Sequence, residues 1–355
     1  MKEVKIKHIF PAANSGDGFY SYFDYMIGKD PKRVYIIKGG PGTGKSSFMK
    51  KIGQAMIDME YDVEYHHCSF DKDSLDGLVI PKLKIVFLDG TGVHAVEPMY
   101  PGIVGRILNF GEFWSEDEIQ RSQNEIISTK NEISSSIKRA YKYFNGAKTI
   151  SLSSEEILKR YFKHKDFYKN LDDKIEEIMT SNLDEKGEEK HYFGSALSSE
   201  GIVDFYDNLL KGTRVTYIKS HLSEASSNYM KEIGRVAKRK GYGVVFYHNP
   251  LNPNLVQTII IENMNMAFTI SHKFQKENHE TINLDKFLDK DILKRHKNQL
   301  KEDRSYVKDL IEVGIEELKA AKRLHKSLEK FYVESMDFDK LANLREDIVN
   351  ELKGL

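Results

Sequence analysis

The stretch RVYIIKGGPGTGKSSFMKKIGQAMIDMEYDVEYHHC, residues 33–68, determines how the rest of the chain is interpreted. Residues 33–38 form a short run of β-branched and aromatic side chains, which is typical of a buried strand. Glycines follow, and apolar side chains at helical spacing then predict a helix over residues 45–59. Residues 62–67 predict a second strand, and KIVFLD at residues 84–89 predicts a third. Strand, helix and strand in alternation indicate a parallel sheet with helices on its faces.

The same plan occurs twice along the chain. RVTYIKSHLSEASSNYMKEIGRVAKRKGYGVVFYHN, residues 214–249, aligns with residues 33–68 at a constant offset of 181, and 12 of the 36 positions are identical. A polar segment, NLDEKGEEK at residues 182–190, separates the two copies. Because the matches share one register and similar flanking elements, the sequence predicts two tandem halves.

Each copy is followed by a charged stretch with apolar residues at helical spacing. SEDE at residues 115–118 and SSEE at residues 153–156 fit a capping box and predict two helix starts. We interpret these stretches as long helical hairpins or arms, which either cover the sheets or bind a protein partner. The predicted units are a first core, its arm, a second core and its arm, at residues 1–114, 115–186, 187–285 and 286–355.

GGPGTGKS at residues 39–46 fits the phosphate-loop pattern G-x-x-x-x-G-K-[ST] in full. Glycines let successive backbone N–H groups point at a phosphate, and the following helix N-terminus adds its positive dipole. Lys45 would place a cation on the β- and γ-phosphates, and the Ser46 hydroxyl would bind Mg²⁺. A glycine loop that only turns the chain would need neither side chain. The residues expected to contact the phosphates are Gly39, Gly40, Pro41, Gly42, Thr43, Gly44, Lys45, Ser46 and Ser47.

The acidic partner of this loop is expected at the end of a nearby hydrophobic strand. Asp89 ends IVFLD, 44 residues after Lys45, and is predicted to hold Mg²⁺ directly or through water. Gly90 follows it, so the catalytic glutamate that many ATPases carry there is absent. His94 and Glu97 are the nearest candidates for a general base, and an ordinary loop role for both stays open.

Further polar side chains follow the second predicted strand, where open α/β sheets bind ligands. They are His66, His67, Cys68, Asp71, Asp73 and Asp76. Histidine and cysteine are zinc ligands. However, neighbouring strand residues point to opposite faces, so His66 and His67 would not easily share one metal. His67 recurs as His248 in the second half, which favours a shared packing or hydrogen-bonding role.

The second half has lost most of the loop chemistry. At the positions of Gly39, Gly42, Gly44, Lys45 and Asp89 it has Ser220, Ser223, Ala225, Ser226 and Ile270. Only the serine of the motif persists, as Ser227. Without the cation, the glycines and the carboxylate, this loop should not bind a nucleoside triphosphate in the usual way. We therefore expect one nucleotide per chain, with the second half as a structural or regulatory partner.

GGPGTGKSS and KIVFLDG resemble the P-loop nucleoside-triphosphatase superfamily. The wider pattern HIF…GFYSYFDY…KGGPGTGKSSFMKKIG…YDVEYHHCS is similar to a little-studied bacterial family of tandem P-loop ATP-binding proteins, over nearly the whole chain. The resemblance implies ATP binding through residues 39–47 and two tandem P-loop-type halves, each a parallel sheet in three layers. The second loop departs from the pattern, which argues against two equivalent sites.

Three classes of function agree with these features. The first, which the long arms and the degenerate copy favour, is a Mg²⁺-dependent ATPase that couples hydrolysis to a conformational change. The second is a nucleotide or small-molecule kinase with the same loop, and the third is an ATP-binding module that does not hydrolyse. The chain has no N-K-x-D sequence to recognise guanine, which favours ATP over GTP.

The composition limits the expected cellular location of the protein and the classes of partner that it would bind. The 355 residues contain 54 Lys and Arg against 54 Asp and Glu, so net charge gives no general attraction to nucleic acid or an anionic membrane. The single cysteine, Cys68, excludes an intramolecular disulfide. No apolar run approaches the roughly 20 residues needed to span a bilayer. We expect a cytoplasmic protein with no membrane partner and no specific signal for nucleic acid.

Overall fold

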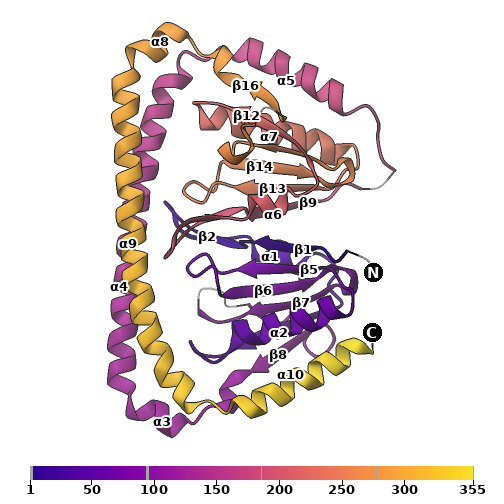
Figure 1. The fold of residues 1–355 in the computed structure, drawn as a ribbon, viewed down its shortest axis with the longest axis vertical. Coiled ribbons are helices and arrows are strands. Elements are labelled where there is room, and N and C mark those ends of the chain that lie inside the picture. Colours follow the sequence, from indigo (N-terminus) through magenta and orange to yellow (C-terminus); the bar gives the residue numbers. More distant parts are fainter. Residues whose placement is uncertain (1–2, 93–95, 185, 277, 355) are drawn as a thin grey trace.

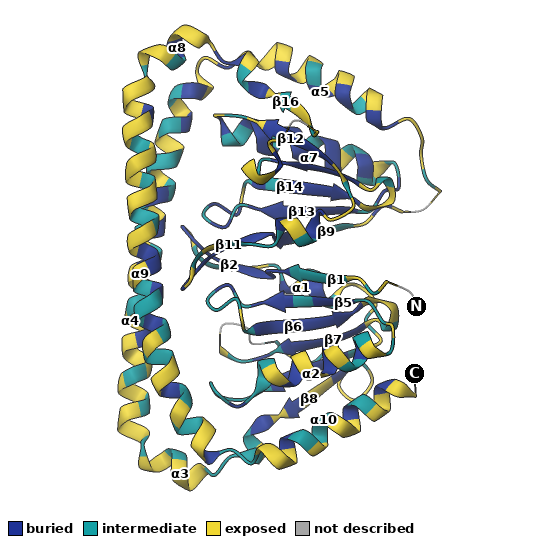
Figure 2. Cartoon of the chain, viewed as in Figure 1, coloured by how far each residue is buried: buried dark blue, intermediate teal, exposed yellow. Residues whose placement is uncertain are grey.

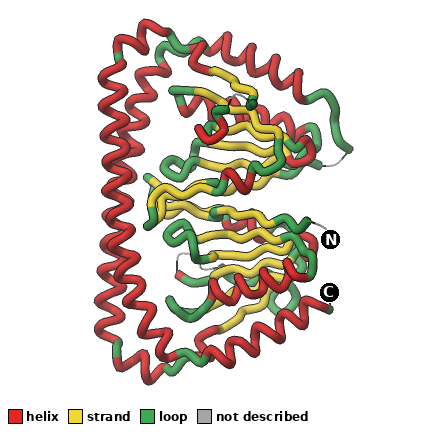
Figure 3. Tube along the Cα trace, in the orientation of Figure 1, coloured by secondary structure: helices red, strands yellow, loops and turns green. Residues whose placement is uncertain are grey.

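A computed structural model describes residues 3–92, 96–184, 186–276 and 278–354. Two α/β halves are stacked beside a pair of long helices, α4 (Gln123–Lys159) and α9 (Lys297–Ser335), which run along one flank of both (Figure 1). Figure 3 shows the strands gathered in two stacks and the long helices outside them. Within the described residues, no helix combines the length and the apolar character needed to cross a membrane.

The first half is built around a six-stranded mixed sheet of order β1-β5-β6-β7-β4-β8. Its strands are β1 Ile6–Ile9, β4 Arg33–Lys38, β5 Val63–His67, β6 Leu75–Ile80, β7 Ile85–Asp89 and β8 Gly105–Asn109. β6 is antiparallel to both neighbours, and the other adjacent pairs are parallel. The prediction of a parallel sheet is therefore wrong at β6. Residues 68–74 form a connection too short for a crossover helix, so the chain turns back beside β5.

The second half repeats this topology strand for strand, in the order β9-β13-β14-β15-β12-β16. Its strands are β9 Glu189–Phe193, β12 Arg214–Lys219, β13 Val244–His248, β14 Val256–Ile261, β15 Met266–Thr269 and β16 Glu280–Asn283. β14 is the antiparallel strand, as β6 is in the first half. The predicted duplication into two α/β halves is confirmed.

Both faces of the first sheet are covered. On one face, α2 (Lys45–Asp58) presents Phe48, Ile52 and Met56, spaced every four residues, to a core shared with α10 (Phe338–Lys353). On the other face, α1 (Phe23–Ile27) packs with strand β2 (Ala12–Ser15), which pairs with β3 (Gly18–Ser21).

The second sheet is covered in the same way. One face carries α7 (Ser223–Arg239) and α5 (His164–Ile178), and the other carries α6 (Tyr206–Leu209). The two halves meet where β2 approaches β10 (Ser195–Ser198), which pairs with β11 (Gly201–Asp204). Phe10 and Phe193 exchange backbone hydrogen bonds of 3.0 and 2.9 Å at this junction.

The helices that follow each sheet are exchanged between the halves. From the first half, α3 (Glu116–Arg121) and α4 lead to α5, which packs on the second core. From the second half, α8 (Lys290–Arg295) and α9 lead back to α10, which packs on the first core (Figure 1). The long helix of each arm thus pairs with the long helix of the other arm, and neither arm forms a helical hairpin of its own.

The two long helices run antiparallel, because Arg139 pairs with Glu317 whereas Ser154 reaches back to Asp303. Their buried residues face each other and the halves, and their exposed residues face outward (Figure 2). A helix start predicted at residues 153–156 is wrong, since α4 continues through this segment without a break.

Candidate functional site

The loop between β4 and α2 has the backbone conformation that its glycines favour. Gly42 and Gly44 have φ angles of 74° and 87°, in the left-handed region that other residues rarely adopt. The Thr43 hydroxyl donates to the Gly40 carbonyl at 2.8 Å and holds the turn together. α2 begins at Lys45, and no side chain of the described residues caps it. Its first N–H groups therefore remain available to an anion.

Lys45 folds back over this loop. Its Nζ donates to the carbonyls of Gly39 and Gly40 at 2.8 Å each and lies 3.6 Å from the Asp89 carboxylate. The Lys45 and Asp89 side chains are only 11% and 15% exposed, so water screens the pair weakly. Residues 39–47 all lie in the loop or in the first turn of α2. The structure therefore brings the predicted cation and its predicted acidic partner together.

Asp89 is held in place by the residues that follow it. One carboxylate oxygen accepts from the backbone N–H of Thr91 at 2.9 Å and from the Thr91 hydroxyl, and the other faces Lys45. A Cβ on Gly90 would lie 2.3 Å from Ile36 Cγ2, so a larger residue there would require the buried Ile36 side chain to shift.

The predicted general bases, His94 and Glu97, stay predictions. His94 lies outside the described residues, and Glu97 is exposed to solvent. A different carboxylate, Asp76 at the start of β6, is only 4% exposed and is replaced by Gln257 in the second half.

The strand register places Asp76 away from the phosphate loop. A β-bulge interrupts β6 here, because Gly77 pairs with His66 whereas Leu75 pairs with His67. Leu75 belongs to the core beneath α2, but a Cβ on Gly77 would meet Met26 of α1, so the bulged residues Asp76 and Gly77 face α1. The counterpart of Asp76 in the second half, Gln257, likewise accepts from the Tyr206 hydroxyl of α6. Asp89 is therefore the carboxylate that the strands place next to Lys45.

Ser46 has a structural contact that sequence comparison could not identify. Its Oγ accepts the backbone N–H of Leu75 at 3.0 Å, and Ser227 Oγ accepts that of Val256 at 2.9 Å. In both halves the serine thus joins the first turn of the helix to the start of the antiparallel strand. This contact explains why the serine persists when the rest of the motif is lost. Its role as a Mg²⁺ ligand stays a prediction.

His67 links three segments of the first half. Its Nε2 lies 2.8 Å from His8 Nδ1, and its Nδ1 lies 2.6 Å from the Lys72 carbonyl. Since a carbonyl only accepts, Nδ1 carries the proton and Nε2 accepts from His8. Burial lowers the pKa of His67 to about 4 and that of His248 to about 3. The second half repeats both contacts with His191, His248 and Pro253. The predicted hydrogen-bonding role of this histidine is confirmed.

His66 lies in different surroundings. It is fully buried, with its Nε2 3.7 Å from a Glu64 carboxylate oxygen and its ring against Tyr192. His67 instead packs against Phe205. The two neighbouring histidines therefore do not form a common metal site.

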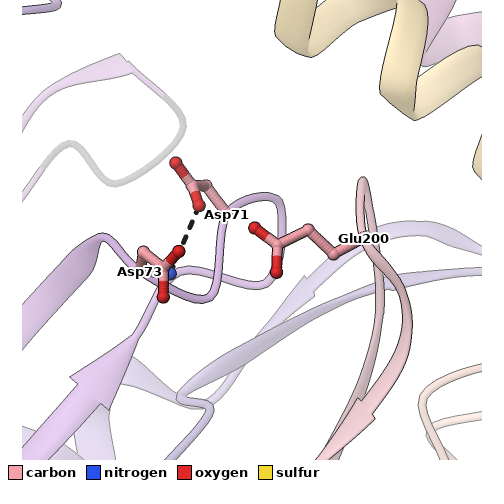
Figure 4. A group of neighbouring side chains, drawn as sticks. All are labelled: Asp71, Asp73 and Glu200. Atoms are coloured by element: carbon pink, nitrogen blue, oxygen red, sulfur yellow. Dashed lines mark hydrogen bonds between the residues drawn. The ribbon is translucent and has the colours of Figure 1, made fainter.

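Three acidic residues gather where the halves meet: Asp71, Asp73 and Glu200 (Figure 4). Lys322 of α9 compensates their charge, with Nζ 3.0 Å from Asp71 and 2.8 Å from Glu200. Lys72 lies 3.3 Å from Glu200 as well. The cluster joins both halves to α9 through ion pairs.

The degenerate loop of the second half has a different backbone. α7 begins at Ser223, which matches Gly42, so helix replaces the left-handed turn that precedes α2. Glu155 of α4 caps this helix, accepting the N–H groups of Ser223 and Glu224 at 3.2 and 3.1 Å. The Glu155 side chain is 8% exposed. A carboxylate of the chain itself therefore occupies the anion position at this helix N-terminus.

No protein-family model, no curated protein and no solved structure matches the chain. The resemblance to P-loop nucleoside triphosphatases thus rests on the two motifs and on the arrangement of their side chains.

Proposed function

We propose that the protein is a Mg²⁺-dependent ATPase that binds one ATP in its first half. The observation that carries the proposal is the juxtaposition of Lys45 and Asp89, 3.6 Å apart, at the uncapped N-terminus of α2. A helix N-terminus, a buried cation and a carboxylate for the metal are the parts that phosphoryl transfer requires.

The side chains at the loop suit Mg²⁺. Ser46 and Asp89 offer hydroxyl and carboxylate oxygens, the hard ligands that this ion prefers, and both adjoin Lys45. When bound, Mg²⁺ would neutralise charge on the transferring phosphoryl group. Lys45 would exchange its two carbonyl contacts for phosphate oxygens.

Coupling to movement is proposed because the end of α9 touches the loop. A Cβ on Gly40 would lie 2.6 Å from the Tyr332 ring, and one on Gly42 would lie 2.8 Å from the Glu329 carbonyl. A change in loop conformation would therefore displace α9, which begins beside the second half. A kinase remains the second candidate, because the same arrangement of Lys45, Ser46 and Asp89 would serve phosphoryl transfer to an acceptor hydroxyl.

The test is phosphate release from ATP by the purified full chain with Mg²⁺. Lys45→Ala should abolish turnover, whereas Ser226→Ala, the matched change in the second half, should leave it intact. Equal turnover by the wild type and Lys45→Ala would refute the proposal. Consumption of ATP with a phosphorylated acceptor and no free phosphate would identify a kinase.

A further inference from the structure

A pocket of about 410 Å³ opens beside the intact loop, and α10 forms one of its walls. Gly44, Ser47 and Lys51 contribute from the loop and α2, and Phe338, Leu341 and Arg345 from α10. Leu341 approaches the loop closely, since a Cβ on Gly44 would lie 3.2 Å from its Cδ2. The pocket thus begins where the phosphate loop ends and continues along α10.

The lining of this pocket is chemically mixed. Phe338 is 42% exposed and offers an aromatic face at the pocket wall. Arg345 and Lys51 bring two positive charges, and neither has an acidic partner within the described part of the chain. An aromatic face next to unpaired cations is suited to a planar base attached to a sugar and phosphates.

We infer that this pocket holds the nucleoside of ATP, with Phe338 against the base and Arg345 beside the ribose and the α-phosphate. The inference rests on the proposed function, because it takes the triphosphate to lie in the loop. The pocket volume falls within the range of roughly 300–1,000 Å³ that is usual for small-molecule sites. The triphosphate would enter the loop along Gly42, Gly44 and Ser47, which the phosphate-loop segment and the pocket share.

The second half fills the corresponding space. Phe167 of α5 packs against Tyr229 of α7 with ring centroids 5.8 Å apart, and both side chains are buried. Tyr229 is the counterpart of Phe48, which lines the pocket in the first half. Where Glu155 occupies the anion position, core aromatic side chains close the adjoining space. The helix N-terminus that is open to an anion and the adjoining pocket are therefore both confined to the first half.

The proposed pocket makes nucleotide binding depend on both halves. α10 reaches the first half through α9, which begins beside the second half. A bound nucleoside would therefore contact α2 on one side and the exchanged helix on the other.

Titration calorimetry of the full chain with Mg²⁺ compares the affinity for ATP with that for inorganic tripolyphosphate. The comparison distinguishes binding of the nucleoside in the pocket from binding of the phosphates in the loop. Phe338→Ala and Arg345→Ala should each weaken ATP binding about 10-fold or more. Phe338→Ala should leave the affinity for tripolyphosphate unchanged, and Phe338→Tyr should restore ATP binding. Tyr168→Ala, which removes an exposed aromatic side chain from α5, is the matched control and should have no effect.

Unchanged ATP affinity in both α10 variants would overturn the inference. The proposed function would survive that result if Lys45→Ala still abolished binding of ATP and tripolyphosphate. A wild-type chain that binds neither compound would overturn both proposals. Equal losses for ATP and tripolyphosphate in Phe338→Ala would place the effect in the loop and likewise contradict a nucleoside pocket.

Discussion

The two halves have the same strand order but differ at the loop after the equivalent strands β4 and β12. In the first half, two left-handed glycines precede α2, and its N-terminus is uncapped by side chains of the described residues. In the second half, helix extends into the loop and Glu155 accepts its N–H groups. The comparison shows how a phosphate-binding geometry can turn into an ordinary capped helix while the surrounding sheet is retained.

The pseudo-symmetry extends to the residue that makes the cap. The backbone N–H of Lys163 donates to the Phe287 carbonyl, and that of Asp337 donates to the Phe113 carbonyl, so the ends of α4 and α9 correspond. By this correspondence Glu329 is the counterpart of Glu155. Its backbone approaches Gly42, but its carboxylate lies 3.4 Å from His325. Both halves thus carry a glutamate beside the loop, and only one of the two caps a helix.

The largest effect is expected when the first loop is made to resemble the second. Gly44→Ala should abolish ATP binding, because a side chain at φ of 87° is strained and would meet Leu341. The strain should also lower the free energy of unfolding by about 1–2 kcal/mol. Calorimetric titration and urea denaturation measure the two effects. Ala225→Gly in the second half is the control and should not create a second site, so two nucleotides per chain would contradict the comparison.

The next effect concerns the carboxylate at the loop that only the first half has. Asp89→Asn should raise the Mg²⁺ concentration needed for turnover, because a neutral amide binds this hard cation more weakly than a carboxylate does. Glu97→Gln is the control and should leave the Mg²⁺ dependence unchanged. If Asp89→Asn shows the same Mg²⁺ dependence as the wild type, the assignment of Asp89 is wrong.

The free energy of unfolding is expected to depend on pH through both halves alike. Burial lowers the pKa of His67 to about 4, below the value of about 6.5 for an unfolded chain. The unfolded chain then binds the proton more readily, so stability falls as the pH drops from 7 towards 4. Between pH 7 and 5, His67 should account for about 2 kcal/mol of the free energy of unfolding, and His248 for a similar amount. Urea denaturation of the wild type, His67→Gln and His248→Gln at pH 7 and pH 5 measures how much each histidine contributes to the change in the free energy of unfolding. A pH dependence that survives in the double variant would assign it to other groups.

The smallest effect is expected at the cap of the second half. Glu155→Ala should lower the free energy of unfolding by about 1 kcal/mol, because two N–H groups of α7 lose their acceptor. ATP binding should not change. Glu156→Ala, an exposed neighbour on the same helix, is the matched control. If Glu155→Ala bound a second nucleotide, the second loop would still be able to bind phosphate, and only the Glu155 carboxylate would block it in the wild type.

Local patterns predicted the elements around the loop closely. The strand expected over residues 33–38 is β4, and the helix expected over 45–59 is α2, which ends one residue earlier. These elements follow from runs of apolar side chains and from glycine positions, which neighbouring residues determine. The antiparallel β6 was missed because strand direction depends on the length of the connection.

Contacts between distant segments could not be predicted in this way. Helical spacing shows that α5 and α10 have an apolar face, but it does not show which core that face contacts. Glu155 lies within the SSEE pattern that predicts a local capping box, yet its carboxylate accepts from α7 and not from the start of a helix of its own. An acid of this kind is recognised only once the position of the second loop is known.

The exchange of α5 and α10 has a consequence for how the protein reaches its native state. Tyr35 of β4 bonds to Glu351 of α10 at 3.0 Å across a separation of 316 residues. During synthesis, the first sheet therefore emerges long before the helix that completes its core, and its apolar face must stay uncovered meanwhile. Folding that waits for such distant contacts is slow and exposes surfaces prone to aggregation. We expect the nascent first half to depend on chaperones until α10 has been made.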